Sequence, residues 1–409
     1  MNDPLRPPVL VLDDDPTGTQ AAADVPVLLR PADVSPTLGG RPAAYLLTNT
    51  RALGREEAVA LVAAARHRAG PGVELVLRGD STLRGHVFPE MRALGLDEAV
   101  GLIVPAFPAA GRVTLGGVHY LTTGGAPVNV ADTEFARDPV FGFSARTMRE
   151  WVAELGGERP VELVGPAAPG DERADAIRDA LLGTPDGGIV VPDVCEDTDF
   201  APIMAGLRAA RLRGRRVVVR CAAPLAALIA GVPGRLVPPS EAGATRLLIV
   251  CGSHTAAATA QLDGVRDLTP PHLVVPTDAL FGEARQDAVR SVVEAARGQL
   301  AGTGVTVVTT ERRRRPEHGA LSDGATVMAG LMAVTRCLAP EVDAIVAKGG
   351  ITSAEVVTSG LGASEATVLG QIEVGISLWQ VGDVPVAVVP GNIGDAGTLA
   401  RMVRYFTGG

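Results

Sequence analysis

Short apolar runs alternate with helical segments along the whole chain. This alternation is typical of a mostly parallel sheet that helices cover on both faces. The predicted fold class is therefore α/β, with three-layer domains. The predicted strands are 9–12, 44–47, 73–77, 101–104, 189–191, 217–219, 246–250, 305–309, 344–346 and 384–389, and the predicted helices include 56–69, 256–262 and 323–338.

A segment rich in proline and glycine, Pro233–Pro239, interrupts this alternation. The pattern then begins again, so we place a domain boundary there, between residues 1–236 and 237–409. The length of 409 residues agrees with two domains, because domains usually hold roughly 100–200 residues. We expect the active site in the cleft between the two domains.

Composition and charge exclude several classes of protein. Hydrophobic residues make up 46% of the chain and charged residues 20%, as in a globular enzyme. The net charge of −9 and the 3% of aromatic residues argue against nucleic-acid binding, which needs a basic face and stacking platforms. The basic run 312–315 is expected to be a solvated or strand-edge cluster. No apolar run reaches the ~18 residues of a membrane span.

The four cysteines show no CxxC spacing, so we expect them to be reduced and mostly buried. The N-terminus lacks the pattern of a signal peptide. Both observations favour a cytoplasmic protein, and a homodimer is common for enzymes of this size.

Three consecutive carboxylates, Asp13–Asp15, follow the first predicted strand, and Thr17 lies close behind them. Their mutual repulsion is costly unless a cation or a hydroxyl-rich ligand uses them. An acidic turn with a cap is the alternative, because Asp and Thr both favour turns. We favour the ligand, since acid runs rarely lie directly against a buried strand.

Polar side chains cluster after the 73–77 strand, where Asp80, Ser81, Arg84 and His86 lie within a few residues. Core packing needs none of them, and crevices beyond strand ends are the usual ligand sites of α/β sheets. Arg84 is suited to clamp a carboxylate, and Asp80 to orient a hydroxyl or take its proton. A salt-bridged loop is the alternative.

Arg112, His119 and Arg137 follow the 101–104 strand and could line the same crevice. Taken alone, each of them is as readily structural as functional.

Three turns in the second half place glycine directly after a predicted strand: 251–255, 348–353 and 390–397. Glycine lets the backbone approach an anion closely, and a helix N-terminus presents amides to a phosphate. The turns lack the spacing of a Walker A loop. The two glycine-rich loops 348–353 and 390–397 in one α/β domain indicate a nucleotide.

The first half thus offers carboxylates and arginines for a polyhydroxy acid, and the second half offers glycine loops for phosphates. Together they predict a small-molecule kinase. Phosphoryl transfer depends on positioning and charge neutralisation, and Mg²⁺ usually supplies part of the charge. The sequence assigns no metal ligands.

At these residues the chain resembles the four-carbon acid sugar kinase family. The matching segments follow the family's order and span nearly the whole chain. They are Asp13–Gln20, Asp80–His86, Glu134–Asp138, Lys348–Ser353 and Pro390–Gly394.

The resemblance implies an ATP-dependent kinase that phosphorylates a hydroxyl of threonate, erythronate or a 3-oxo-tetronate. It also implies an N-terminal sugar-acid domain and a C-terminal nucleotide domain. Together with the motifs, it makes Asp80, Asp14 and Arg84 the expected catalytic residues. The expected substrate-binding residues are Asp14, Asp15, Thr17, Asp80, Ser81, Arg84, His86 and Arg112, and the expected ATP-binding residues are Ser253, Thr255, Lys348, Gly349, Gly350, Ile351, Thr352, Gly391, Asn392 and Gly394.

Glu373 departs from the family, which usually carries prolines and no acid in this segment, so the local loop shape is expected to differ. Three alternatives stay open. A ribokinase-like kinase would place Gly-Ala-Gly-Asp near the C-terminus, which 392–395 only loosely resembles. A dehydrogenase would need GxGxxG after the first strand, which is absent. A non-catalytic metabolite sensor of the same fold would not consume ATP.

Overall fold

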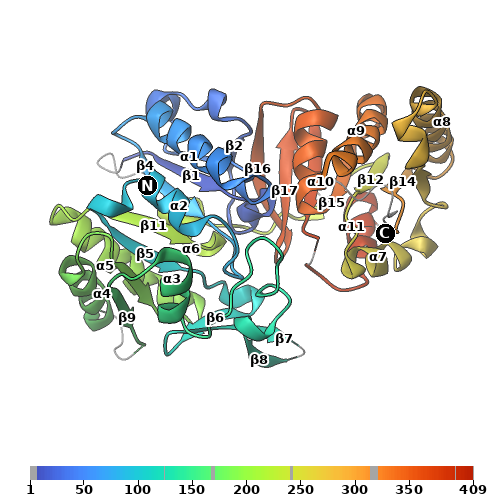
Figure 1. Ribbon diagram of the computed structural model, residues 1–409. Helices are drawn as coiled ribbons and strands as arrows, with labels where there is room; N and C mark the ends of the chain where they lie inside the picture. Colours follow the sequence, from blue (N-terminus) through green and yellow to red (C-terminus); the bar gives the residue numbers. More distant parts are fainter. Residues whose placement is uncertain are drawn as a thin grey trace. The chain divides into compact units, whose positions relative to one another are not determined.

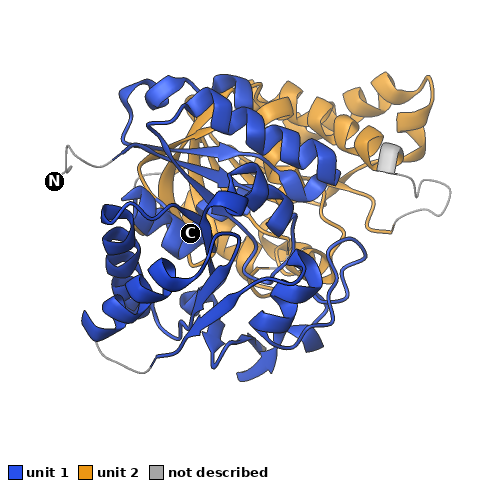
Figure 2. Cartoon of the chain, turned by 60° about the vertical axis from the view of Figure 1, so that its left-hand side comes forward, with its two compact units in different colours: residues 1–22, 30–233 blue, residues 23–29, 234–409 orange. Residues whose placement is uncertain are grey.

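The computed structural model describes residues 7–123, 125–166, 171–239, 243–313, 321–391 and 393–408. The chain forms two compact units, coloured separately in Figure 2. The first unit consists of residues 1–22 and 30–233, and the second of residues 23–29 and 234–409. The predicted boundary at 236/237 assigned residues 23–29 to the N-terminal domain, whereas in the structure they belong to the second unit.

The first unit is built on a sheet with the strand order β3-β1-β4-β11-β5-β10-β9, of which β1, β4, β11, β5 and β9 are labelled in Figure 1. Each adjacent pair is parallel. Helices and a small antiparallel sheet, β6-β7-β8, complete it. The strands are β1 (Val9–Asp13), β3 (Ala43–Leu47), β4 (Glu74–Arg78), β5 (Val100–Val104), β6 (Arg112–Leu115), β7 (Val118–Thr123), β8 (Ala126–Asn129), β9 (Val161–Val164), β10 (Ile189–Pro192) and β11 (Val217–Cys221), and the helices are α1 (Arg55–Ala69), α2 (Val87–Ala93), α3 (Met148–Gly156), α4 (Asp171–Gly183), α5 (Phe200–Leu212) and α6 (Ala223–Ala230).

The sheet of the second unit has the order β13-β14-β12-β15-β18-β17-β16-β2. Its pairs are parallel from β13 to β18 and antiparallel from β18 to β2. The strands are β2 (Val25–Leu28), β12 (Leu247–Cys251), β13 (Leu273–Val275), β14 (Val305–Thr310), β15 (Ala344–Lys348), β16 (Glu365–Glu373), β17 (Ile376–Val381) and β18 (Val384–Val389), and the helices are α7 (Ala256–Asp263), α8 (Arg285–Thr303), α9 (Leu321–Leu338), α10 (Gly350–Glu355) and α11 (Thr398–Thr407).

The apolar runs form the central strands because both faces of a parallel sheet are covered. Every residue of β1, β3, β12 and β15 is buried. The predicted strands and helices are all present, and the α/β fold class is confirmed. The expectation that the cysteines are mostly buried is only half right, because Cys195 and Cys337 are exposed, although all four are free thiols.

Strand β2 lies near the N-terminus, yet it pairs with β16 in the second unit, with Val25 opposite Val368. The Leu29 N–H extends this pairing by donating to Ser364 O at 3.1 Å. The sequence did not predict this strand, because a four-residue apolar segment carries no information about its partner.

Strand register brings the polar loops together within each unit. In the first unit, Asp13 lies opposite Arg78, which lies opposite Cys221. In the second, Lys348 lies between Cys251 and Val389 on adjacent strands. Because these strands are parallel, the loops that follow them leave the sheet at one edge.

Candidate functional site

Guanidinium groups surround the aspartates at the end of β1. Arg78 Nη1 donates to Asp13 Oδ1 at 3.0 Å and lies 3.3 Å from Asp14 Oδ1. Arg220 of β11 donates to Asp14 Oδ2 at 3.2 Å and to Glu90. All five side chains are buried. The repulsion between consecutive acids is therefore offset by arginines from neighbouring strands.

Arg51 joins the two acidic loops. Its guanidinium lies 2.6 Å from Asp15 Oδ2, 3.5 Å from Asp14 Oδ1 and 3.7 Å from Asp80 Oδ2. Asp15 also accepts the Thr17 N–H at 2.8 Å and so caps the following turn. Arg51 was not predicted from the sequence. The available signal was a basic residue shortly after the end of β3.

Gly18 is required by the close approach of the Asp13 carboxylate. A Cβ at residue 18 would lie 2.0 Å from Asp13 Oδ1. Asp13 Oδ2 is buried and has no hydrogen-bond partner in the described part of the chain. Burial raises the pKa of Asp13 to about 7, although Arg78 acts in the opposite direction.

The loop after β4 is held by its own side chains and by the 134–138 segment. The Thr82 hydroxyl and Arg84 Nε both donate to Asp80 Oδ2, the latter at 2.8 Å. The Arg84 guanidinium lies over the Phe135 ring, 4.9 Å from its centroid. A cation over an aromatic face is attracted to it. The structure thus brings together two segments that the sequence analysis singled out separately.

The carboxylates differ in proton affinity. Burial alone would raise the pKa of Asp80, but Arg51 and Arg84 outweigh it and hold that pKa well below its usual range. Burial raises the pKa of Asp14 despite its arginine neighbours. Asp80 is therefore a fixed anion that accepts hydrogen bonds, whereas Asp14 has the higher affinity for a proton.

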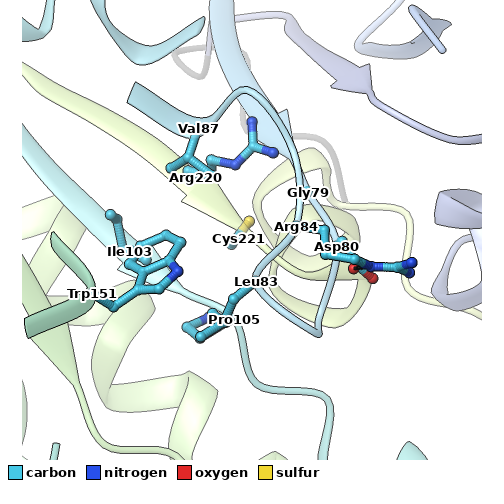
Figure 3. Close-up of a pocket in the computed structure, with 10 residues that line it drawn as sticks. All are labelled: Gly79, Asp80, Leu83, Arg84, Val87, Ile103, Pro105, Trp151, Arg220 and Cys221. Atoms are coloured by element: carbon cyan, nitrogen blue, oxygen red, sulfur yellow. Dashed lines mark hydrogen bonds and ion pairs between the residues drawn. The ribbon is translucent and has the colours of Figure 1, made fainter. Parts of the chain in front are cut away.

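A small cavity lies behind this loop (Figure 3). Its walls include Leu83, Ile103 and Trp151, and its volume of about 20 Å³ leaves room for roughly one water molecule. Leu83 has a φ of +71°, a strained value for a residue with a side chain. Asp80 and Arg84 extend away from the apolar walls in Figure 3. A four-carbon acid does not fit this cavity.

The Ser81 carbonyl and the His86 ring each contact a residue that is distant in the sequence. His119 is buried, with Nε2 2.8 Å from the Ser81 carbonyl oxygen and Nδ1 3.0 Å from the Thr114 hydroxyl. Burial lowers the pKa of His119 to about 4, so it is a neutral support for the loop. His86 Nε2 lies 3.0 Å from the Leu53 carbonyl oxygen. These contacts give both histidines a structural role within the first unit.

Arg112 and Arg137 occupy different environments. Arg112 donates to Ala110 O, and its Nε is buried without a partner among the described residues. Burial lowers the pKa of Arg112, while the nearby charge of Asp80 raises it. Arg137 is exposed and donates to Asp132 O at 3.2 Å. Arg112 lies near the acidic loop, whereas Arg137 forms no hydrogen bond or ion pair with that loop among the described residues.

In the second unit, the three glycine turns converge. The Thr255 hydroxyl caps α7 by accepting the Ala258 N–H and donates to Gly391 O at 2.9 Å. Ser253 Oγ lies 3.3 Å from Thr255 Oγ1. A Cβ at Gly349, whose φ is +116°, would lie 3.0 Å from Ser253 Cβ. The loops after β12, β15 and β18 therefore touch one another.

Thr352 and Gly252 join this group, since a Cβ at Gly252 would lie 2.7 Å from Thr352 Oγ1. Gly350 begins α10, and the side chain of Ile351 in its first turn is exposed. Asn392 lies outside the described residues.

The carbonyls of the loop after β18 are turned into the protein. Lys348 Nζ donates to Pro390 O at 2.5 Å, and Gln261 Nε2 donates to Ile393 O at 2.9 Å. Gly394 has a φ of +87°, and a Cβ there would lie 2.1 Å from Thr398 Oγ1. A loop whose carbonyls are bonded within the protein can turn amides outward, as anion-binding loops do.

Lys348 and Arg312 place two positive charges beside these turns. Lys348 is fully buried and is the only lysine among the 37 lysine and arginine residues. Burial lowers its pKa to about 8. Within the described ranges, no carboxylate forms an ion pair with either cation. A buried cation without a counterion is costly, so the site favours an anion.

Glu373 has a structural explanation. It accepts hydrogen bonds from Arg401 Nε and Nη2 at 2.8 and 2.9 Å. Arg401 Nη1 also donates to Asp395 Oδ1 at 2.9 Å. The departure from the family pattern thus ties the end of β16 to the segment after the third glycine turn.

Among the residues that the structure describes, no group of three or more His, Cys, Asp or Glu side chains is placed to hold a metal ion. No helix in that part of the chain combines the length and hydrophobicity needed to cross a bilayer.

Two family models match the chain. A sugar-binding N-terminal domain matches residues 9–229, and a nucleotide-binding C-terminal domain matches residues 248–399. The first match contains the carboxylate and arginine network, and the second contains most of the converging glycine turns. The chain therefore belongs to the four-carbon acid sugar kinase family, as its motifs predicted.

One relative is the D-erythronate kinase of Heliobacterium modesticaldum (strain ATCC 51547 / Ice1), which is 33% identical over 232 residues. The match covers 54% of this chain and 50% of that protein, so it spans about half the length of the relative.

Two solved structures share the fold. A Salmonella typhimurium LT2 protein, provisionally named a tRNA synthase, has a TM-score of 0.76 at 20% identity over 98% of this chain and 99% of its own. Haemophilus influenzae protein HI1011 has a TM-score of 0.65 at 16% identity over 95% and 97%. At these identities the likeness concerns the fold alone.

Proposed function

We propose that this protein is an ATP-dependent kinase that phosphorylates a hydroxyl group of a four-carbon sugar acid. The observation that carries the proposal is the contrast in charge between the two units. Arginines of the first unit's site are largely paired with carboxylates, whereas no carboxylate among the described residues pairs with Lys348 or Arg312 of the second unit. The unneutralised cations favour phosphates, and the paired network favours a hydroxylated ligand.

The acceptor is a four-carbon sugar acid of the erythronate, threonate or 3-oxo-tetronate type. The family and the name of the D-erythronate kinase relative support this class. Charged and hydroxyl groups around Asp14, Asp15, Thr17 and Asp80 suit a ligand with several hydroxyls. Each hydroxyl of such a ligand needs a hydrogen-bond partner when water is removed.

The carboxylate of the acceptor has two candidate partners. Arg84 is already engaged with Asp80 and lies 3.5 Å from Asp138. Arg112 bonds only to its own turn and keeps a buried Nε without a partner in the described chain. We therefore assign the substrate carboxylate to Arg112, and give Arg84 the task of fixing Asp80.

Asp80 orients the acceptor hydroxyl by accepting its hydrogen bond. Its arginine neighbours keep it ionised, and a weak base is unsuited to remove a proton. Asp14, whose pKa burial raises, is the better proton acceptor. The oxygen then attacks the γ-phosphorus in line, its bond to phosphorus forms as the bond to the ADP oxygen breaks, and Asp14 receives the hydroxyl proton.

ATP would be held by the amides and hydroxyls of the glycine turns at Ser253, Thr255, 349–352 and 391–394, with Lys348 beside them. The convergence of these turns fits a phosphate chain. Mg²⁺, which is commonly held through one or two carboxylates and the phosphates themselves, would neutralise part of the phosphate charge. The described residues do not assign a protein ligand to it.

The test is an ADP-release assay with ATP and Mg²⁺ against D- and L-erythronate, D- and L-threonate and the 3-oxo-tetronates, with ribose and fructose as controls. Turnover on a four-carbon acid alone supports the proposal. Turnover on the sugars instead favours a ribokinase-like activity. Binding of ADP without turnover on any acceptor favours a sensor, and no ADP binding refutes the assignment of the glycine turns.

A further inference from the structure

Arg312 lies directly against the first glycine turn. It follows β14 and donates through Nη2 to the Ser253 carbonyl oxygen and, at 3.1 Å, to Thr259 Oγ1 of α7. Its Nη1 lies 3.4 Å from Thr309 Oγ1. The guanidinium therefore links the turn, the helix that follows it and the neighbouring strand.

The run 312–315 was expected to be a solvated or strand-edge cluster, and for Arg312 the solvated alternative is wrong. Arg312 is partly buried, whereas the adjacent Arg313 is exposed. Residues 314 and 315 of the basic run lie outside the described ranges. The partners of Arg312 are a carbonyl, two hydroxyls and the Cys251 sulfur at 4.0 Å. None of these neutralises its charge.

We infer that Arg312 is a positioning residue for the phosphate-binding turn 252–255, an inference that rests on the proposed nucleotide site. In a trans peptide the carbonyl and the next N–H point in opposite directions. Holding Ser253 O against Arg312 therefore directs the N–H of residue 254 away from the guanidinium. The same contact places a positive charge behind the turn, where it favours an anion in front.

The fork of the guanidinium explains why an arginine is suited here. It has several donors in one plane, and those of Arg312 reach three elements at once. A lysine ammonium is a compact charge on a flexible stem and cannot satisfy the same set of acceptors together. Arg312→Lys is therefore expected to preserve the charge but not the geometry.

The experiment compares Arg312→Ala, Arg312→Lys and the matched control Arg313→Ala in the full chain. Dissociation constants for ADP and for adenosine are measured by calorimetry, together with kcat and the KM values for ATP and for the best acid. Loss of a charged hydrogen bond predicts a roughly 10- to 100-fold weaker ADP affinity for Arg312→Ala. Arg312→Lys is expected to lie between this variant and the unmodified protein.

Adenosine affinity, the KM for the acid and all properties of Arg313→Ala are expected to change less than twofold. Equal losses for ADP and adenosine would overturn the inference, because the residue would then support the fold rather than the phosphates. Unchanged ADP affinity in a folded Arg312→Ala protein would also overturn it. If Arg312→Ala does not fold, Arg312→Lys gives the same comparison. Absence of ADP binding to the unmodified protein would instead reject the nucleotide site and, with it, this inference.

Discussion

Replacing Lys348 by methionine should stabilise the protein and weaken its binding of ADP at the same time. The ammonium is fully buried and donates to Pro390 O, and burial lowers its pKa from 10.5 to about 8. Each pKa unit corresponds to about 1.4 kcal/mol, so the buried charge costs the folded state about 3 kcal/mol at neutral pH.

Methionine has a similar length and no charge, but it leaves Pro390 O without its donor. An unsatisfied buried carbonyl costs roughly 1–2 kcal/mol. The net gain is therefore about 1–2 kcal/mol, which for a unit of this size raises Tm by about 2–8 °C. The lost cation should weaken ADP binding by about 10- to 100-fold.

The pH dependence has a definite sign. Between pH 8 and 10.5 the unfolded chain holds a proton on Lys348 that the folded chain has lost, so stability should rise with pH across this range. The destabilising contribution is fully present below about pH 8. The methionine variant should lack this rise, and ADP affinity of the unmodified protein should fall above pH 8.

Because Lys348 is the only lysine, the assay is direct. Protein labelled with ¹³C,¹⁵N-lysine gives one set of side-chain NMR signals, whose titration reports the pKa with and without ADP. Bound phosphate should raise that pKa. A value near 10.5 in the free protein, or a Lys348→Met variant of lower Tm and unchanged ADP affinity, would refute the reasoning.

Three further predictions concern other parts of the two sites. Asp80→Asn should reduce kcat by about 100-fold or more with unchanged ADP affinity, because the hydroxyl loses its charged acceptor; equal turnover would exclude Asp80 from the reaction. Arg112→Gln should raise the KM for the acid by about 10- to 100-fold but leave the KM for the corresponding four-carbon polyol unchanged. If Arg84→Gln raised the KM for the acid, relative to that for the polyol, more than Arg112→Gln does, Arg84 would be the residue that binds the substrate carboxylate. Glu373→Gln should weaken ADP binding, because it breaks the ion pair that ties the end of β16 to the segment after the third glycine turn. The pair with Arg401 is partly exposed, so the loss of affinity should not exceed about fivefold. In 0.5 M salt this difference should disappear, and a difference that persists would argue against an ionic cause.

The chemistry of each site was visible in the sequence to different degrees. Asp14, Asp80 and the glycine turns were found because each follows a continuous apolar run that has to be a strand. Arg51 and Arg220 were missed. Arg51 lies in an unremarkable turn, and Arg220 interrupts an apolar strand without any local sign of the acids that it contacts.

Arg312 is a second case in which the local sequence did not predict a long-range contact. Its neighbours in the sequence are basic, and local composition predicted a solvated or strand-edge cluster. The structure instead packs its side chain against Ser253, far away along the chain. Glu373 was recognised as unusual, but its partner Arg401 could not be named from the sequence.

The sequence by itself determined the α/β class, many of the parallel strands and the loops that carry polar residues, because hydrophobic periodicity and turn chemistry act over a few neighbouring residues. The tertiary structure decided which charges meet. Only strand order and register place Arg78 beside Asp13, and only long-range pairing gives β2 to the second unit. Such contacts depend on the packing of segments distant in the chain, and no local pattern encodes their partners.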